Sequence, residues 1–192
     1  MSLPHLLSEL VETIPAEVPY LGRSEWKNEQ LLPVEQFKIG IAWGGSPTQK
    51  NDHNRSSQLI DWLPVLRTPG VTFYSLQKGP RTEELSTLPD DVQVLDLDSQ
   101  LNTFGDTAKF ILQMDLMISV DTSVAHLSGA LGQPVWTALC YMPDWRWLMD
   151  RNDSPWYPTM RLFGQTQPKV WADVFERIAQ ALAEVTTQHG RR

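Results

Sequence analysis

The chain has 192 residues, of which 41% are hydrophobic and 20% charged, and its formal net charge is −7. This length suits one sizeable domain, and the negative charge argues against a general nucleic-acid-binding or anionic-membrane surface, since both require clustered cations. The single cysteine, Cys140, excludes an internal disulfide framework, and no apolar run approaches the ~20 residues of a membrane span, so we expect a cytoplasmic protein without a transmembrane segment.

Residues 1–36 differ in pattern from the rest of the chain. Prolines at positions 4, 15 and 19 cut short any helix there, and "SEWKNEQLLPVEQ" (24–36) predicts at most one short polar helix. We expect residues 1–36 to form a linker or strap on the domain. That domain should cover residues 37–187, and residues 188–192 should form a disordered tail.

From Phe37 onward, short apolar runs alternate with helical patterns. The runs predict strands over 37–43, 71–77, 92–97, 116–121, 134–140 and 160–165. Helices are predicted over 56–67, which Pro64 should bend or end early, and over 80–87, 105–115, 123–132 and 170–187. This alternation is typical of βαβ units, so we predict an α/β fold: a Rossmann-like, doubly wound, mostly parallel sheet of about six strands.

Ligands of such sheets bind beyond the carboxyl ends of the strands, and one candidate there is the turn into the helix that begins near Asp121. A helix start leaves backbone N–H groups unpaired and carries a partial positive charge, which favours a phosphate. His126 lies one turn after Thr122, so both side chains face the same side. Small residues keep this helix slim: Ser123, Ala125, Ser128, Gly129 and Ala130. A capped structural helix with a satisfied histidine is an equally open interpretation.

A second candidate is the polar stretch "AWGGSPTQKNDHNRSS" (42–57). Gly44 and Gly45 allow a sharp turn and close approach of a ligand, and Ser46 adds a hydroxyl. Lys50 and Arg55 add positive charge. Charge-assisted hydrogen bonds contribute ~1.5–3 kcal/mol each, against ~0.3–1 for a helix terminus, so these two cations would dominate phosphate affinity if both loops face one crevice. The alternative is a solvated polar loop. The glycine fingerprints of dinucleotide and P-loop sites are absent from the sequence.

Two further stretches at the expected carboxyl edge carry polar or aromatic groups. Asp96 and Asp98 in "DLDSQ" are better suited to capping a turn or meeting a ligand hydroxyl than to a metal, and the four histidines lack ligand spacing, so we predict no metal site. In "YMPDWRWLMDRNDSPWYP" (141–158), aromatic faces suit sugar rings and nucleobases but also fill space. We favour a structural role for Trp145 and Trp156, and ligand contact for Asp144 and Arg146.

Taken together, "GIAWGGSP…KND…NRS", "FYSLQKGP", "FGDTAKFILQMDLMISVDTSVAHLSGALGQPVW" and "PDWRWLMDRNDSPWYPTMRLF" form a combination that resembles a known family. They are similar to the C-terminal half of bacterial heptosyltransferase-like (glycosyltransferase family 9-like) enzymes, in the version fused to tetratricopeptide repeats. The resemblance covers about residues 37–185, and D-T-S-x-A-H-L-x-G-A-L-G-x-P-V-W is its most specific part. It implies the donor-binding half of a two-domain GT-B glycosyltransferase, which binds a nucleotide-diphosphate sugar without a metal or another cofactor.

The resemblance also implies roles for particular residues. The diphosphate would lie near Thr122, Ser123 and His126, with Ser46, Lys50 and Arg55 opposite. The residues that would stabilise the leaving group are Lys50, Arg55, Thr122 and His126. The other substrate-binding candidates are Gly44, Gly45, Gln77, Lys78, Asp96, Leu97, Asp121, Asp144 and Arg146, of which Gln77, Lys78, Asp96 and Leu97 would approach the nucleoside.

The resemblance leaves donor and acceptor open. The family usually has Asp-Ser/Thr-Gly where this chain has Asp121-Thr122-Ser123, so the nucleotide and the sugar are not fixed. The acceptor-binding half, which carries the general base, does not fit into residues 1–36. We therefore expect the donor-binding domain of an inverting transferase with an unknown acceptor (a glycan, a lipid-linked sugar or a protein) that transfers sugar poorly by itself. The alternative is a non-catalytic module for nucleotide binding or protein interaction.

Overall fold

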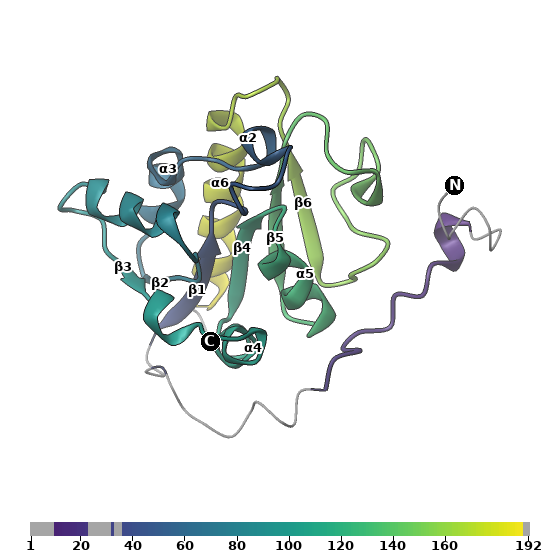
Figure 1. Cartoon of the computed structure of the whole chain (residues 1–192), viewed down its shortest axis with the longest axis horizontal. Coiled ribbons are helices and arrows are strands. Elements are labelled where there is room, and N and C mark those ends of the chain that lie inside the picture. Colours follow the sequence, from purple (N-terminus) through teal and green to yellow (C-terminus); the bar gives the residue numbers. More distant parts are fainter. Residues whose placement is uncertain (1–9, 23–31, 33–35, 190–192) are drawn as a thin grey trace.

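The protein is described by a computed structural model that covers residues 10–22, 32 and 36–189. Its centre is a six-stranded sheet in the order β3-β2-β1-β4-β5-β6 with every pairing parallel, and helices flank it on both faces (Figure 1). The strands are β1 (Phe37–Ala42), β2 (Val71–Ser75), β3 (Val94–Asp96), β4 (Leu116–Val120), β5 (Val135–Leu139) and β6 (Met160–Gly164). The predicted Rossmann-like α/β fold is confirmed.

The helices are mostly short, and several are 3₁₀ rather than α. The α-helices are α2 (Asp52–Arg55), α3 (Leu63–Leu66), α4 (Phe104–Ile111), α5 (Ser123–Ala130) and α6 (Ala172–His189). The 3₁₀ segments are η1 (Val11–Thr13), η2 (Leu59–Trp62), η3 (Pro80–Thr87), η4 (Asp98–Gln100) and η5 (Trp145–Trp147). The helix predicted over 56–67, with an interruption at Pro64, is instead a 3₁₀ turn that leads into α3, where Pro64 is the second residue and its missing N–H leaves no hydrogen bond unmade.

Each face of the sheet buries its own core because side chains alternate along a strand. Ile39 and Ile41 of β1 face a core completed by α3 and α6. Met117 of β4 faces the other core, which α4 and α5 cover. A Cβ on Gly40 would lie 2.9 Å from Leu76 Cδ1 and closer still to Met117, so a side chain there would require these neighbours to shift. Two full cores fix the sheet as the rigid base of the loops described below.

The parallel strands place all their carboxyl ends at one edge, the upper edge in Figure 1, where α2 lies. The chain leaves β1 toward β2 on one side, while β4 pairs with β1 on the other. The crevice of such a sheet lies where the strand order reverses in this way. The loop after β1 and the start of α5 after β4 flank that position.

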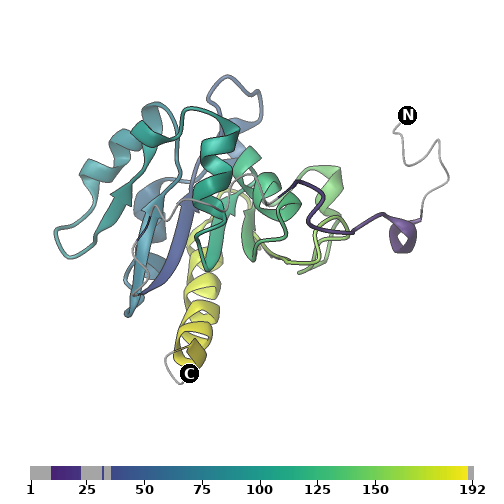
Figure 2. The same cartoon turned by 90° about the horizontal axis from the view of Figure 1, so that it is seen from below.

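The segment before the sheet touches the domain at the far end of α5 (Figure 2). The backbone N–H groups of Tyr20 and Leu21 donate to the carbonyl of Ala130 at 3.1 and 3.4 Å, and Val18 packs against the core beneath α5. This contact fits the strap expected from the prolines. The helix expected over 24–36 lies outside the described residues, except that Leu32 is buried and Gln36 exposed.

The carboxyl-terminal helix α6 extends to His189. It therefore includes the first two residues of the tail expected over 188–192, and residues 190–192 lie outside the described part. In the part of the chain that the structure describes, no helix is both long and apolar enough to cross a bilayer.

Candidate functional site at the carboxyl edge

The start of α5 presents its first backbone N–H groups without a side-chain cap. Thr122 occupies the N-cap position, but its hydroxyl lies 2.9 Å from the hydroxyl of Ser119 and makes no capping hydrogen bond. Ser123, the first helical residue, is exposed. The unpaired N–H groups and the positive end of the helix dipole are therefore available to an anion at this edge.

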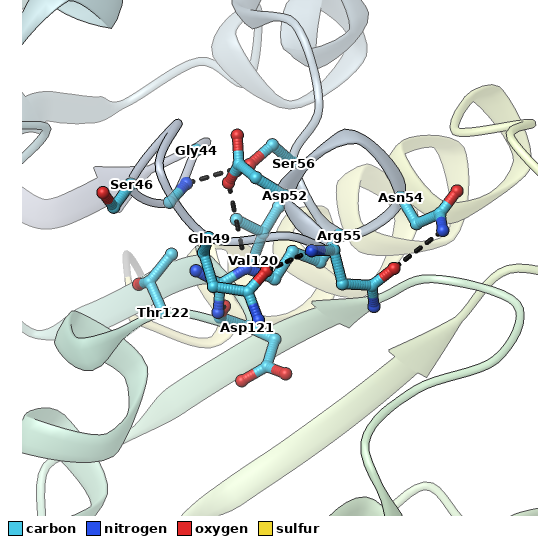
Figure 3. A network of polar contacts seen from close by, with 12 residues as sticks. Gly44, Ser46, Gln49, Asp52, Asn54, Arg55, Ser56, Val120, Asp121 and Thr122 are labelled. Atoms are coloured by element: carbon cyan, nitrogen blue, oxygen red, sulfur yellow. Dashed lines mark hydrogen bonds and ion pairs between the residues drawn. The ribbon is translucent and has the colours of Figure 1, made fainter.

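Arg55 connects the loop after β1 to the start of α5. Its Nη1 donates to the backbone carbonyl of Asp121 at 3.1 Å, and Figure 3 shows the side chain reaching across from α2 to the end of β4. The two loops that the sequence analysis singled out thus lie against each other. On the same loop, Lys50 is exposed and the hydroxyl of Ser46 lies 2.8 Å from that of Thr48.

Asp52 anchors the segment after β1 that carries Lys50 and Arg55, called the cationic loop below. Asp52 was not identified from the sequence. Its buried carboxylate pairs with Arg81 Nη2 at 2.7 Å, lies 3.8 Å from Arg55 Nε, and accepts a hydrogen bond from Ser56 Oγ at 2.7 Å. Arg81, also unidentified, comes from η3, 29 positions along the chain. The signal in the sequence was limited to the i,i+3 spacing of Asp52 and Arg55, which applies only if α2 forms.

The side chains of Arg81 and Arg55 lie so close to the backbone that they favour glycine at positions 44 and 45. A Cβ on Gly44 would meet the side chain of Arg81, and one on Gly45 would lie 2.5 Å from Arg55 Nη2. The glycines therefore let two guanidinium groups pack against backbone.

Gln77 orders the same loop from β2. Its Oε1 accepts from the backbone N–H groups of Trp43 and Gly44 at 3.1 and 2.9 Å, and its Nε2 donates to the Gly44 carbonyl at 3.0 Å. Gln77 is buried, as is Leu97, so the structure places both side chains within the protein. Lys78 and Asp96 are exposed, with Lys78 Nζ 2.9 Å from Asp98 Oδ1. Direct contact of these four residues with a nucleoside stays a prediction.

His126 links Asp121 to Tyr157. Its Nε2 lies 3.5 Å from Asp121 Oδ1, its Nδ1 lies 3.1 Å from the Tyr157 hydroxyl, and its ring stacks on Trp147 at 5.0 Å. Burial and, second, the adjoining Tyr20 hydroxyl raise the pKa of Tyr157, so its phenol stays protonated beside His126 Nδ1.

The pKa of Asp121 is lowered. Burial alone would raise this pKa, but hydrogen-bonding groups on His126 and Trp147, with the positive charges of His126 and Arg55, outweigh it. A carboxylate thus sits beside the start of α5 and is balanced by its neighbours.

A pocket of about 380 Å³ lies between α5 and the β5–β6 loop, with a wall made by His126, Trp145, Arg146, Trp156 and Tyr157. Arg146 Nε lies 3.3 Å from Asp144 Oδ1, so the two ligand-contact candidates of this loop are paired. Trp145 is 57% exposed, and the structural role favoured from the sequence is wrong for it. Trp147 is fully buried and fills that role instead. Among the described residues, no group of three or more His, Cys, Asp or Glu could hold a metal ion.

Comparison with known proteins gives one similar sequence and several similar structures. No family model matches the chain. Protein FlbA of Caulobacter vibrioides is 31% identical over 170 residues, which are 84% of this chain and 27% of FlbA. The chain thus spans about a quarter of the length of this curated relative.

Two of the structural neighbours are E. coli heptosyltransferases. ADP-heptose LPS heptosyltransferase II matches with a TM-score of 0.53 and 17% identity over 83% of this chain and 49% of that enzyme. Heptosyltransferase WaaC with ADP matches with a TM-score of 0.55 and 17% identity over 82% of this chain and 46% of WaaC. The chain spans less than half of either enzyme, and at this identity the likeness concerns the fold. That shared fold is a Rossmann-like α/β domain built on a six-stranded parallel sheet.

Proposed function

We propose that this chain is the donor-binding domain of a metal-independent, inverting glycosyltransferase and holds a nucleotide-diphosphate sugar at the carboxyl edge of its sheet. The observation that supports this most strongly is the 3.1 Å hydrogen bond from Arg55 to the Asp121 carbonyl, which brings the cationic loop against the uncapped start of α5. The shared fold with WaaC, solved with ADP, is consistent with a nucleoside diphosphate as the ligand.

The diphosphate would be bound from two sides. Backbone N–H groups at Ser123 and its successors would contact one side. Lys50, Ser46 and Arg55 would contact the other. The guanidinium of Arg55 has five N–H donors and uses one on Asp121, so further donors on its two Nη atoms can bind phosphate oxygens.

The reaction would be a direct displacement at the anomeric carbon. The oxygen of an acceptor hydroxyl would bond to that carbon while the bond to the β-phosphate oxygen breaks, and the nucleoside diphosphate would leave with the electron pair. The proton of the acceptor hydroxyl would pass to a general base in the acceptor-binding half of the enzyme. The α5 terminus, Lys50 and Arg55 would stabilise the negative charge that develops on the leaving group. Thr122 and His126 would contribute at the same helix end. The acceptor would be a glycan, a lipid-linked sugar or a protein.

The nucleoside would extend toward β2 and β3, where Lys78 and Asp96 are exposed. The proposed donor domain comprises residues 37–187, with the strap before it as a linker. We place its donor in the cytoplasm, and the resemblance to repeat-fused transferases suggests an adjoining tetratricopeptide segment.

Calorimetric titration with ADP, UDP and GDP tests this proposal. At least one should bind, and Lys50→Ala/Arg55→Ala should weaken its binding by about tenfold or more, because each charge-assisted bond contributes ~1.5–3 kcal/mol and 1.4 kcal/mol is a factor of ten. Arg67→Ala is the matched control: it removes a cation at the opposite edge of the sheet, where Arg67 pairs with Asp91 at 2.9 Å. Absence of binding, or an unchanged affinity in the folded double variant, would refute the proposed site.

A further inference from the structure

We propose that the pocket between α5 and the β5–β6 loop is the subsite for the donor's sugar, and that it selects a neutral pyranose. The exposed face of Trp145 would stack on the ring, and Arg146 with Asp144 would bind its hydroxyls. This inference rests on the proposed function, since the sugar reaches the pocket only if the diphosphate lies at the start of α5.

The aromatic wall of the pocket presents one open ring face. Trp156 meets Trp145 edge-on, with ring centroids 6.2 Å apart and an interplanar angle of 85°. The Nε1 of Trp156 donates to the Arg146 carbonyl at 2.8 Å, which fixes that indole in place. The exposed Trp145 face is therefore held toward the pocket, where the apolar C–H face of a pyranose can cover it.

The polar groups at the rim suit hydroxyls rather than a charged substituent. Arg146 Nε lies 3.3 Å from Asp144 Oδ1, and the Asp144 side chain also accepts from the Arg146 backbone N–H at 3.2 Å. The pair offers both donors and an acceptor, as hydroxyl groups require, while its opposite charges compensate each other. A uronic or other acidic sugar would have to compete with Asp144 for the guanidinium.

The loop that carries Trp145 is held rigidly. Trp147 is fully buried and stacks on His126 at 5.0 Å, which anchors the η5 turn. Leu148, which follows it, has φ 57° and ψ 178°, a backbone conformation that is strained for a residue with a side chain. Strain of this kind persists where the surrounding packing enforces it, and it occurs at ligand clamps. The turn thus positions Trp145 before any ligand arrives.

The location of the pocket fits a sugar attached to the β-phosphate. His126 belongs to the pocket wall and also faces Asp121 at 3.5 Å. Along α5, Ser123 and His126 are separated by about 4.5 Å, since each residue rises 1.5 Å. A sugar directly linked to a diphosphate at Ser123 therefore falls beside His126. The strand order places β5 on the opposite side of β4 from β1 and β2, so sugar and nucleoside diverge from the crevice.

The test compares each nucleotide with its sugar conjugate by calorimetry, using ADP with ADP-glucose, UDP with UDP-glucose, and GDP with GDP-mannose. The wild type should bind the cognate conjugate more tightly than the nucleotide. Trp145→Ala should weaken the binding of the conjugate by about three- to tenfold, the range for one aromatic contact, and leave the affinity for the nucleotide unchanged. Trp145→Phe should retain part of the difference in affinity between the conjugate and the nucleotide. Tyr141→Ala is the control, since Tyr141 is 46% exposed and lies outside the pocket wall.

The outcomes separate the two proposals. If no nucleoside diphosphate binds, the proposed function fails and this inference with it. If a nucleotide binds but its conjugate binds no more tightly, or Trp145→Ala weakens both equally, the sugar subsite alone is refuted. Tighter binding of UDP-glucuronate than of UDP-glucose would overturn the preference for a neutral sugar.

Discussion

Asp121 is the residue at which the two parts of the candidate site meet. Its backbone carbonyl accepts the hydrogen bond from Arg55, and its carboxylate faces His126, which in turn contacts Tyr157. The backbone of Asp121 thus contacts the cationic loop, and its side chain contacts the pocket wall. Its position directly after a buried strand explains how one residue makes both contacts.

The lowered pKa of Asp121 predicts a pH dependence of stability. A carboxyl whose pKa is lowered in the folded state stabilises the protein fully above its ordinary pKa of about 3.9, and this contribution disappears as the pH falls through the lowered folded value. Asp121→Asn should therefore be less stable than the wild type at neutral pH, and the difference should shrink in acid below about pH 4. Urea unfolding of both proteins across this range measures it. A difference that stays constant or grows in acid would disprove the assignment.

Asp52 predicts a second effect on stability. Asp52→Asn removes the charge that two guanidinium groups and Ser56 share, and we expect a loss of about 1–3 kcal/mol in the free energy of unfolding. Nucleotide affinity should fall as well, because Arg55 loses its support. Asp91→Asn, in an exposed pair with Arg67, should cost less, because solvent screens exposed ion pairs. Equal effects of the two substitutions in urea denaturation would contradict a structural role for Asp52.

At the scale of elements, the small residues of α5 allow the β5–β6 loop to pack close to the helix. A Cβ on Gly129 would lie 2.5 Å from Cγ of Tyr157, whose hydroxyl contacts His126. The run of small residues, noted from the sequence as a means of close approach, thus lets the β5–β6 loop lie against the helix. In this way the helix both offers its N-terminus and forms a wall of the pocket.

Gly129→Ala should push Tyr157 away from α5. Overpacking of a buried site costs about 1–3 kcal/mol, which exceeds the gain of roughly 1 kcal/mol from replacing a helical glycine by alanine. Thermal and urea unfolding should show a net loss relative to Gly164→Ala, because nothing lies within 4 Å of a Cβ at Gly164. A variant at position 129 that matches this control would indicate that Tyr157 is not tightly packed there.

The sequence predicted the strands well and the short helices less well. Runs such as "FKIGIAW" and "LMISVD" mark buried parallel strands because both faces of such a strand lie in a core. The stretches 56–67 and 80–87 carry helical spacing, but periodicity does not distinguish an α-helix from a 3₁₀ segment. Pro64 correctly marked an interruption, and its position within α3 depends on tertiary packing.

Only part of the candidate site could be predicted, because some of its contacts also depend on tertiary packing. The approach of the loop after β1 to the start of α5, seen in the contact of Arg55 with Asp121, could be predicted because strand ends share one edge of a parallel sheet. Asp52 and Arg81 depend on how η3 folds back over α2, and Trp145 depends on the direction of a loop. Such contacts between distant segments have no local pattern in the sequence.

For the molecule as a whole, the two cores make the sheet rigid, and the candidate site lies at its carboxyl edge. The cationic loop and the start of α5 occupy the crevice beside β1 and β4, and the aromatic pocket lies beside α5, between that helix and the β5–β6 loop. In the proposed function, a nucleotide-diphosphate sugar would extend along this edge from the nucleoside to the sugar. The strap touches the opposite end of α5, where Tyr20 adjoins Tyr157.

Amide chemical-shift mapping by NMR, during a titration with whichever of ADP, UDP or GDP binds, tests the central claim most directly. If the diphosphate lies between the cationic loop and α5, the largest shifts will fall on the backbone N–H groups of Gly45, Ser46, Ser123 and Val124. Residues at the amino edge of the sheet, such as Arg67 and Gly70, will stay unchanged. Shifts centred on that amino edge, or on α6, with Ser123 and Ser46 unmoved, would contradict the account.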